Sequence, residues 1–162
     1  MPEVLRQVSV VFLIKENEVL LAMKKRGFGK GRWNGAGGKP DPGEQIETTA
    51  VRECQEEINV TPRSLRKVAI LDFYFPKEKA NKGFNQQAHV FLCDDWDGEP
   101  SETEEMRPKW FSKDKIPYNE MWSDDIYWLP RILGRECIKG EFYFDDFDQV
   151  VDFDIKPLSE LS

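Results

Sequence analysis

The stretch GKPDPGEQIETTAVRECQEEINV, residues 38–60, decides how this chain folds. Its first part, Gly38 to Gly43, is rich in glycine and proline, which predicts a loop. From Glu44 onward the residues mostly favour helix, and the next proline is Pro62, so we expect a helix of about four turns. One side of that helix carries an apolar stripe that can dock on a core, formed by Ile46, Ala50, Cys54 and Ile58.

The same helix presents three carboxylates on one face, because Glu53, Glu56 and Glu57 are spaced i, i+3 and i+4. Like charges at this spacing destabilise a helix by roughly 0.2–0.5 kcal/mol per pair. A hard divalent cation reverses that effect, since carboxylate oxygens are the ligands that magnesium takes. On charge alone, a solvated acidic face is the simpler interpretation. The loop favours a metal site instead, because Glu44 stands where the helix dipole favours a carboxylate and Arg52 can pair with it.

The order of these residues resembles the Nudix box. The matching positions are Gly38, then Glu44 after five residues, then Arg52 to Glu57 after seven more. Two positions depart from the usual pattern, because Cys54 replaces an aliphatic residue and Asn59 replaces a late glycine. A small apolar cysteine can still pack, and asparagine tolerates the left-handed conformation that ends many helices. We therefore expect the fold to tolerate both replacements.

The Nudix resemblance implies the fold and the chemistry together. The fold is α+β, a Nudix-type α/β/α sandwich with a mixed central β-sheet and two main helices. The reaction is hydrolysis of a nucleoside diphosphate linked to another group, with Mg²⁺ or Mn²⁺ as the cofactor. The catalytic residues it implies are Glu44, Arg52, Glu53, Glu56 and Glu57. The metal ligands it implies are Glu53, Glu56 and Glu57 with the Gly38 carbonyl, and Glu105 as a further ligand or base.

Segments outside this box resemble the vertebrate-type MutT homologues, which are Nudix enzymes acting on oxidised purine nucleoside triphosphates. The matches are Met23–Gly29 with Gly31–Gly35, Glu105–Pro108 with Trp110 and Phe111, and Met121–Asp125 with Tyr127 and Trp128. The resemblance implies hydrolysis of substrates like 8-oxo-dGTP, and also 2-oxo-dATP, to the monophosphate and pyrophosphate, which sanitises the nucleotide pool. The implied substrate-binding residues are Ser9, Lys24, Phe28, Asn34, Phe73, Trp122, Asp124 and Asp125. The main departure is the loop from Lys77 to Gln87, which is longer here and borders the expected pocket.

Each of these residues also has a simpler structural interpretation. Phe73 and Trp122 offer flat faces for a base, but most aromatic residues of a chain belong to its core. Asn34 can donate and accept at a base edge, but asparagine before glycine is a common turn residue. Asp124 and Asp125 could simply begin a helix. In a closed apolar pocket, however, such neighbours resist ionising together, so one should keep a proton and donate to an oxidised base while the other accepts.

Composition limits the class of protein and its partners. The 162 residues suit a single domain, residues 1–162, and the net charge of −7 argues against a general nucleic-acid or anionic-membrane binder. The odd count of cysteines, Cys54, Cys93 and Cys137, has no metal or redox spacing and suits a reducing compartment. There is no signal-peptide pattern, and the longest apolar run, Val10 to Ile14, is too short to span a bilayer. We expect a cytoplasmic monomer whose partner is a small nucleotide, with no nucleic acid and no membrane.

Hydrophobic patterns predict the remaining elements. Strands are expected at 8–14 and 19–23, joined as a hairpin, and at 68–75, 88–93 and 106–111. A helix should follow Ser123 and run to about residue 136, and Pro130 should kink it or divide it into two segments. A final hairpin should join 141–147 to 150–155. Segments 76–87 and 94–105 read as loops, and His89 as a packed strand residue. The basic loop from Lys24 to Arg32 is either solvated or faces phosphates.

Two other functions remain open on these residues. A non-catalytic nucleotide-sensing module could keep the fold, but it would have no need of the full set from Arg52 to Glu57. A Nudix hydrolase could also act on another substrate, such as a dinucleoside polyphosphate or a nucleotide sugar. A phosphate-release assay with magnesium separates the enzyme from the sensor.

Overall fold

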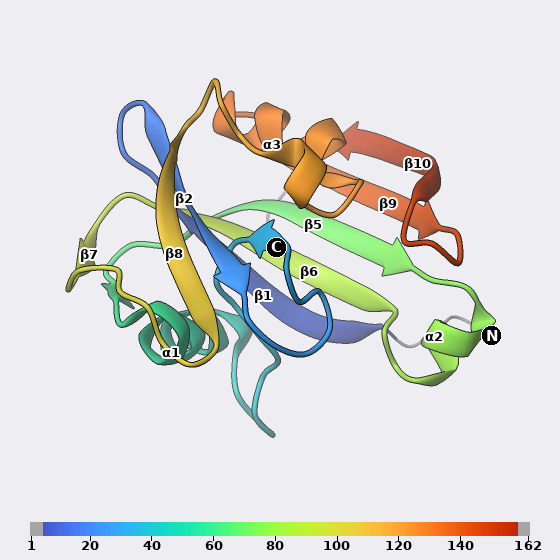
Figure 1. Cartoon of the computed structure of the whole chain (residues 1–162), viewed down its shortest axis with the longest axis horizontal. Helices are drawn as coiled ribbons and strands as arrows, with labels where there is room; N and C mark the ends of the chain where they lie inside the picture. Colours follow the sequence, from blue (N-terminus) through green and yellow to red (C-terminus); the bar gives the residue numbers. More distant parts are fainter. Residues whose placement is uncertain (1–4, 159–162) are drawn as a thin grey trace.

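The computed structural model describes residues 5–158, and within them the main element is a mixed sheet of five strands (Figure 1). Its strands, in spatial order, are β1 (Arg6–Leu13), β6 (Gln86–Cys93), β5 (Arg66–Tyr74), β9 (Ile138–Phe144) and β10 (Val150–Pro157). The pairs β1–β6 and β5–β9 are parallel, and the pairs β5–β6 and β9–β10 are antiparallel. The predicted mixed sheet is confirmed.

A smaller antiparallel sheet crosses the first one. It contains β3 (Trp33–Asn34), β2 (Glu18–Lys24) and β8 (Met106–Ser112), in that order, and a short separate pair joins β4 (Thr61–Pro62) to β7 (Trp96–Asp97). The helices are α1 (Ile46–Ile58), α2 (Lys77–Asn81) and α3 (Asp125–Leu133), with a 3₁₀ turn at Tyr118–Glu120.

The two faces of the central sheet are buried in two separate cores, because successive residues of a strand point to opposite faces. On β1, Phe12 enters one core, whereas Val11 and Leu13 enter the other. The first core includes Trp128, Leu129 and Ile132 of α3, and the second includes Ala50, Cys54 and Ile58 of α1. Helices α1 and α3 therefore cover opposite faces, as Figure 1 shows, and the predicted α/β/α sandwich with two main helices is confirmed.

Helix α1 accommodates both departures from the Nudix pattern. Cys54 is fully buried in the second core, where a small apolar side chain fits. Asn59 ends the helix in the left-handed conformation, with φ of 61°, and its N–H donates to the Cys54 carbonyl. Asparagine thus performs the terminal role that glycine commonly has.

The hairpin predicted for segments 8–14 and 19–23 forms only at its turn. Ile14 and Val19 make one antiparallel bridge and the Lys15 N–H donates to the Glu18 carbonyl, but β1 and β2 belong to different sheets. The reason is that the second edge of β1 is already occupied. Ser9 N donates to the Gly38 carbonyl, and Val11 exchanges backbone hydrogen bonds with Ala36 in both directions.

The C-terminal helix and its neighbouring loops also differ from expectation. Helix α3 ends at Leu133 rather than near residue 136, and Pro130 lies inside it without dividing it. No side chain caps its start, because the Ser123 hydroxyl instead bonds the backbone at residues 148 and 150. The segments 76–87 and 94–105, expected as loops, contain α2 and β7.

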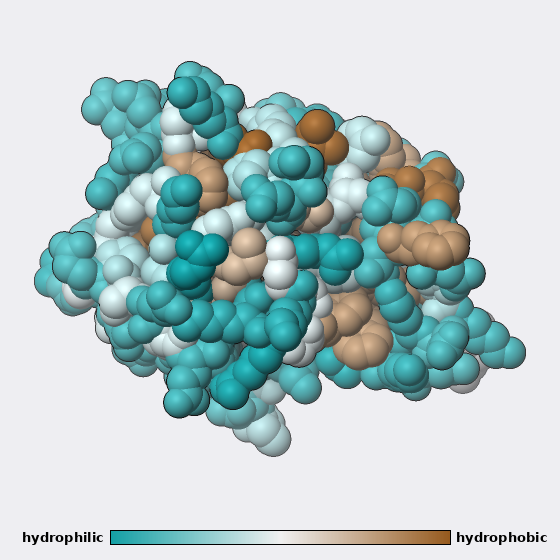
Figure 2. All heavy atoms as spheres, in the orientation of Figure 1, coloured by the Kyte–Doolittle hydropathy of each residue, from teal (hydrophilic) through white to brown (hydrophobic). Residues whose placement is uncertain are grey.

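The surface is mostly polar. Figure 2 shows hydrophilic residues over most of one face, with small apolar patches between them. Of residues 5–158, no helix has both the length and the apolar character that crossing a membrane requires.

Gly37 provides a test of how closely the loop before α1 packs on β1. A Cβ at this position would lie 1.7 Å from the Ser9 carbonyl oxygen, so any side chain must push the strand away. We expect Gly37→Ala to lower the free energy of unfolding by about 1–3 kcal/mol, the usual cost of overpacking. Gly134→Ala is the control, because its nearest contact would be 3.3 Å. Equal melting temperatures for the two variants would contradict this packing.

Candidate active site

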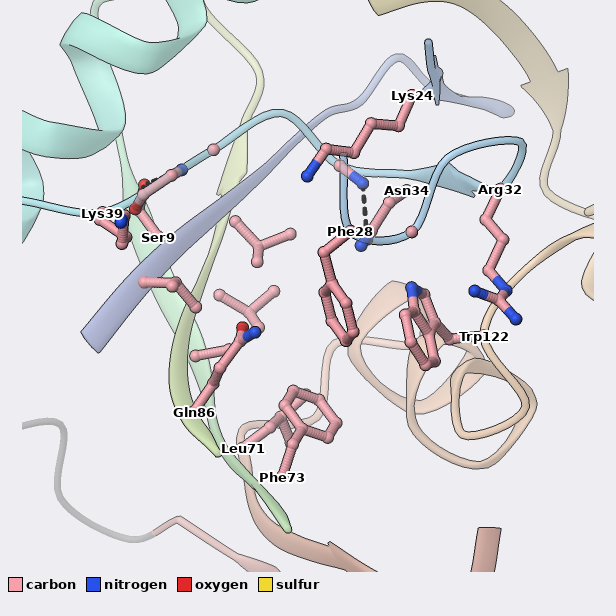
Figure 3. Close-up of a pocket in the computed structure, with 18 of the residues that line it drawn as sticks. Ser9, Lys24, Phe28, Arg32, Asn34, Lys39, Leu71, Phe73, Gln86 and Trp122 are labelled. Carbon is pink, nitrogen blue, oxygen red and sulfur yellow. Dashed lines mark hydrogen bonds between the residues drawn. The ribbon is translucent and has the colours of Figure 1, made fainter. Parts of the chain in front are cut away.

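A cavity of about 440 Å³ opens between the central sheet and the loops that precede α1 and α3 (Figure 3). Figure 3 shows Ser9 and Lys39 at one side of it and Trp122 with Arg32 at the other, while Leu71, Phe73 and Gln86 point in from the sheet. The basic loop of residues 24–32 lines the cavity rather than serving only as a solvated connection. His89, by contrast, is not among its lining residues; its Nε2 shares a hydrogen bond with the Gln7 side chain.

One end of the cavity is acidic. Glu57 is only 5% exposed, and its Oε1 accepts a hydrogen bond of 2.8 Å from Gly37 N. Burial raises the pKa of Glu57 to about 8, against the opposing effect of that bond. Burial also raises the pKa of Glu53, although Arg52 partly counteracts it. Carboxylates whose pKa values are raised by burial are stabilised in their charged form by any cation placed beside them.

Arg52 connects this end to the loop before α1. Its Nε and Nη2 atoms each lie 2.9 Å from a Glu44 oxygen, which is a bidentate pair, and Nη2 also donates to the Lys39 carbonyl. Its Nη1 donates to Glu53 and Glu56. The Arg52 guanidinium lowers the pKa of Glu44 to about 2, with help from the Thr49 hydroxyl. The ion pair predicted between Arg52 and Glu44 is thus present.

The predicted metal ligands are only partly brought together. Glu53, Glu57 and Glu105 line the cavity with Gly38, whereas Glu56 is exposed on the Arg52 side. Within residues 5–158, no three acidic, histidine or cysteine side chains converge closely enough to form a ready metal cage. The donor chemistry nevertheless fits a hard cation, since all of these groups offer oxygen. Gly38 also suits the site, because a Cβ there would lie 2.5 Å from the Glu53 carboxyl carbon.

The opposite end of the cavity contains two buried aspartates. Asp124 and Asp125 are each 2% exposed, and the Trp128 indole donates a 2.6 Å hydrogen bond to Asp124 Oδ2. Asp125 Oδ2 is buried and has no hydrogen-bond partner among the described residues. Burial raises the pKa of both groups, and the neighbouring Asp124 raises that of Asp125 further. The pair is thus enclosed as the sequence predicted, and neither member makes a side-chain cap on α3.

Aromatic rings and one amide line the same cavity as these aspartates. Phe28 and Trp122 lie with their ring centroids 5.0 Å apart, and both line the cavity. Phe73 lines it too, while also packing against Phe142 in the first core. Asn34 Oδ1 accepts a hydrogen bond from the Gly35 amide, which orients the side chain so that its NH2 group can donate to a ligand.

Sequence reasoning missed a polar network behind Trp122. The Arg32 guanidinium carbon lies 4.1 Å from the centroid of a Trp122 ring, and its Nη2 pairs with Asp148 at 3.3 Å. Lys79 of α2 pairs with the same carboxylate, and Ser123 donates to the Asp148 carbonyl. Arg32 and Asp148 are 116 positions apart, so no local pattern could have indicated the contact.

Comparison with known proteins agrees with this geometry. A family model described as the NUDIX domain matches residues 4–132, and the chain belongs to this family. It is 42% identical over 153 residues to the oxidized purine nucleoside triphosphate hydrolase of Danio rerio, covering 94% of this chain and 96% of that protein. It is 41% identical over 151 residues to the Mus musculus protein of the same name, covering 93% and 94%. A crystal structure of a MutT protein from Bacillus halodurans has a TM-score of 0.78 at 22% identity, covers 95% of this chain and 99% of that one, and shows the shared fold.

The bond between Arg52 and Glu44 predicts a specific dependence of stability on pH. The folded-state pKa of Glu44 is depressed from 4.5 to about 2, so its stabilising effect is complete above the unfolded value and is lost as pH falls toward 2. The free energies of unfolding of wild type and Glu44→Gln should therefore differ most above about pH 5 and converge near pH 2. Urea titrations across this range measure the difference. The exposed Glu47 provides the control variant Glu47→Gln. If the free energies of unfolding of wild type and Glu44→Gln differ by the same amount at every pH, the assignment is contradicted.

Proposed function

We propose that this chain is a divalent-metal-dependent hydrolase of oxidised purine nucleoside triphosphates, which releases the monophosphate and pyrophosphate. The observation that carries the proposal is one cavity with two chemically different ends. Carboxylates and lysines at one end suit a metal-bound triphosphate, and two buried aspartates beside aromatic rings at the other suit an altered purine. The names of the relatives from zebrafish and mouse support the same substrate class.

At the acidic end, Glu53, Glu57, Glu105 and the Gly38 carbonyl would hold Mg²⁺ or Mn²⁺, the ions we propose because Nudix hydrolases generally use divalent cations. When bound, the ion would neutralise charge on the phosphates and help to activate water. The chain itself orients the carboxylates. Arg52 holds Glu53 through a 3.0 Å bond, and the Gly37 N–H holds Glu57.

Glu56 lies apart from the other three glutamates, because it pairs with Arg52 outside the cavity. Its proposed part in the metal set requires another side-chain position, which the variants below test. Lys24 lines the cavity, where its ammonium group can bind phosphate oxygens. We infer the same phosphate-binding environment for Ser9, which is buried beside Gly38 and hydrogen-bonds its carbonyl.

At the other end, the aspartates would read the edge of the base. The raised pKa of Asp125 favours its protonated form near neutrality, so it can donate, while Asp124 accepts. Exchange of the proton between the two would match a second edge, such as that of an oxidised adenine, without moving side chains. Trp122, Phe28 and Phe73 would pack against the base, and Asn34 would donate to it.

The alternatives remain distinct in their chemistry. A nucleotide sensor would not need the buried carboxylates at the acidic end, and a hydrolase for dinucleoside polyphosphates or nucleotide sugars would not need the two buried aspartates at the other end. We also infer a cytoplasmic monomer, formed of one domain, that binds neither nucleic acid nor membrane. The acidic net charge of −7 supports the last two inferences.

The proposed reaction predicts a substrate preference and a metal requirement. With Mg²⁺ present, kcat/KM should be highest for 8-oxo-dGTP or 2-oxo-dATP in a panel that includes the four ordinary deoxynucleoside triphosphates, a dinucleoside polyphosphate and a nucleotide sugar. Glu57→Gln and Glu56→Gln should each lower kcat by orders of magnitude with an unchanged fold, because each removes a charged ligand. Glu47→Gln, an exposed residue of the same helix, should keep wild-type kcat.

These measurements separate the possible outcomes. Absence of turnover across the panel, with nucleotide binding retained, would favour the sensor. A preference for the dinucleoside polyphosphate or nucleotide sugar would favour the other Nudix substrates. Full activity of both glutamine variants at saturating Mg²⁺ would overturn the metal assignment.

The shared proton predicts that Asp124→Asn changes substrate choice more than metal dependence. The amide cannot exchange a proton with Asp125, so the ratio of kcat/KM for 8-oxo-dGTP to that for 2-oxo-dATP should change strongly. A site built on hydrogen bonds discriminates because a mismatched substrate leaves buried polar groups unpaired. Asp125→Ala should weaken the binding of both substrates. The ratio should be measured from about pH 6 to about pH 9, around the range in which such a raised pair titrates. If the ratio is constant with pH, and alanine at either aspartate leaves activity unchanged, then the two residues only begin α3 and do not contact the base.

A further inference from the structure

The segment between α2 and β6 is folded against the rim of the cavity. It reverses direction at Gly83, whose φ is +80°, and the Phe84 N–H donates to the Lys79 carbonyl. Asn85 is 6% exposed; its Oδ1 accepts a 2.7 Å hydrogen bond from Phe75 N, and its carbonyl accepts one from Arg6 N. The segment that departs most from the family pattern is thereby tied to β1 and to the end of β5.

This attachment places Phe84 in a row of flat side chains along the cavity. The Phe84 ring stacks on Phe28 with centroids 4.3 Å apart and planes 12° apart. Phe28 in turn meets Trp122 at 5.0 Å and 37°. A guanidinium group covers each outer ring, with Arg6 5.7 Å from the Phe84 centroid and Arg32 4.1 Å from that of Trp122.

The two ring contacts of Phe28 differ in geometry. The rings of Phe28 and Phe84 are close and nearly parallel, whereas the rings of Phe28 and Trp122 are tilted and farther apart. A flat base enters more easily between Phe28 and Trp122, because separating Phe28 from Phe84 would sacrifice their parallel stacking. Trp122 is also close in the chain to Asp124 and Asp125, so a base there can present its edge to the two aspartates. Figure 3 shows the Phe28 and Trp122 side chains next to each other, entering from different segments of the chain.

We propose that Phe84 is a positioning residue that holds the Phe28 ring as a stacking face opposite Trp122, and that it thereby sets the affinity of the site for a two-ring base. A purine covers more of that face than a pyrimidine, so the effect is base-selective. The inference rests on the proposed function, in that it assumes a nucleobase at this end of the cavity. It assigns a role to a loop that the Nudix pattern left without one.

The test compares Phe84→Ala, Phe84→Leu and Phe84→Tyr with Lys82→Ala, an exposed control in the same loop. Calorimetry measures the Kd of 8-oxo-dGMP and of dCMP, and steady-state kinetics measures kcat and KM for 8-oxo-dGTP. Alanine or leucine should weaken 8-oxo-dGMP binding, and raise KM, by about 3- to 10-fold, the size that an aromatic pair contributes. The Kd of dCMP and the kcat for 8-oxo-dGTP should change less. Phe84→Tyr keeps an aromatic ring, so it should show wild-type Kd and KM, and Lys82→Ala should also match wild type.

Phe84→Leu keeps apolar bulk, so it carries the test if the alanine variant fails to fold. Unchanged 8-oxo-dGMP binding, or equal weakening of both monophosphates, would overturn the inference while leaving the proposed function intact. If wild type instead fails to hydrolyse oxidised purine triphosphates, the proposed function fails. The same binding comparison is then made with the monophosphate of the best triphosphate in the panel, and a loss confined to the alanine and leucine variants supports the role of Phe84.

Discussion

The bidentate bond between Arg52 and Glu44 is the interaction on which the rest of the acidic end depends. It joins the first turns of α1 to the glycine-rich loop, and the same guanidinium also binds the Lys39 carbonyl. With the loop held in this way, Gly38 lies against the Glu53 carboxylate and pairs with β1 through Ser9. The carboxylates are therefore held by specific contacts, Glu53 by the Arg52 side chain and Glu57 by the Gly37 N–H, which fixes their orientation.

The two ends of the cavity share one physical problem, which is negative charge removed from water. At the acidic end, Glu57 is buried with a raised pKa, and an oxygen-liganded cation would stabilise its charged form. At the end with Asp124 and Asp125, the two carboxyl groups are buried side by side and Arg32 opposes only part of the rise in the pKa of Asp125, so a proton is the available counter-charge. One end thus suits a metal-bound phosphate, and the other suits a hydrogen-bonding base edge.

The network around Asp148 shows how distant segments support the end of the cavity that contains Asp124 and Asp125. Its carboxylate receives Arg32 from one loop and Lys79 from α2, and its carbonyl receives Ser123. These contacts place Arg32 behind Trp122 and connect the α2 loop to the segment that carries the aspartates. A change in any of the segments that carry Arg32, Lys79 or Ser123 should therefore alter the position of the Trp122 ring.

Local sequence determined α1, its apolar stripe, its pair with the preceding loop and its end at Asn59, because helix periodicity and loop composition are short-range properties. It also indicated the glutamate cluster of α1 and the pair Asp124 and Asp125. The sequence could not determine that β1 pairs with Ala36 and Gly38 rather than with β2, since strand pairing is chosen by competition between distant edges. Nor could it place Phe84 on Phe28 or Arg32 on Asp148, because only packing of the whole chain brings such residues together. Tertiary structure likewise decided that the side chains of Asp124 and Asp125 are buried in the cavity wall without capping α3, since segments remote in the chain complete that cavity.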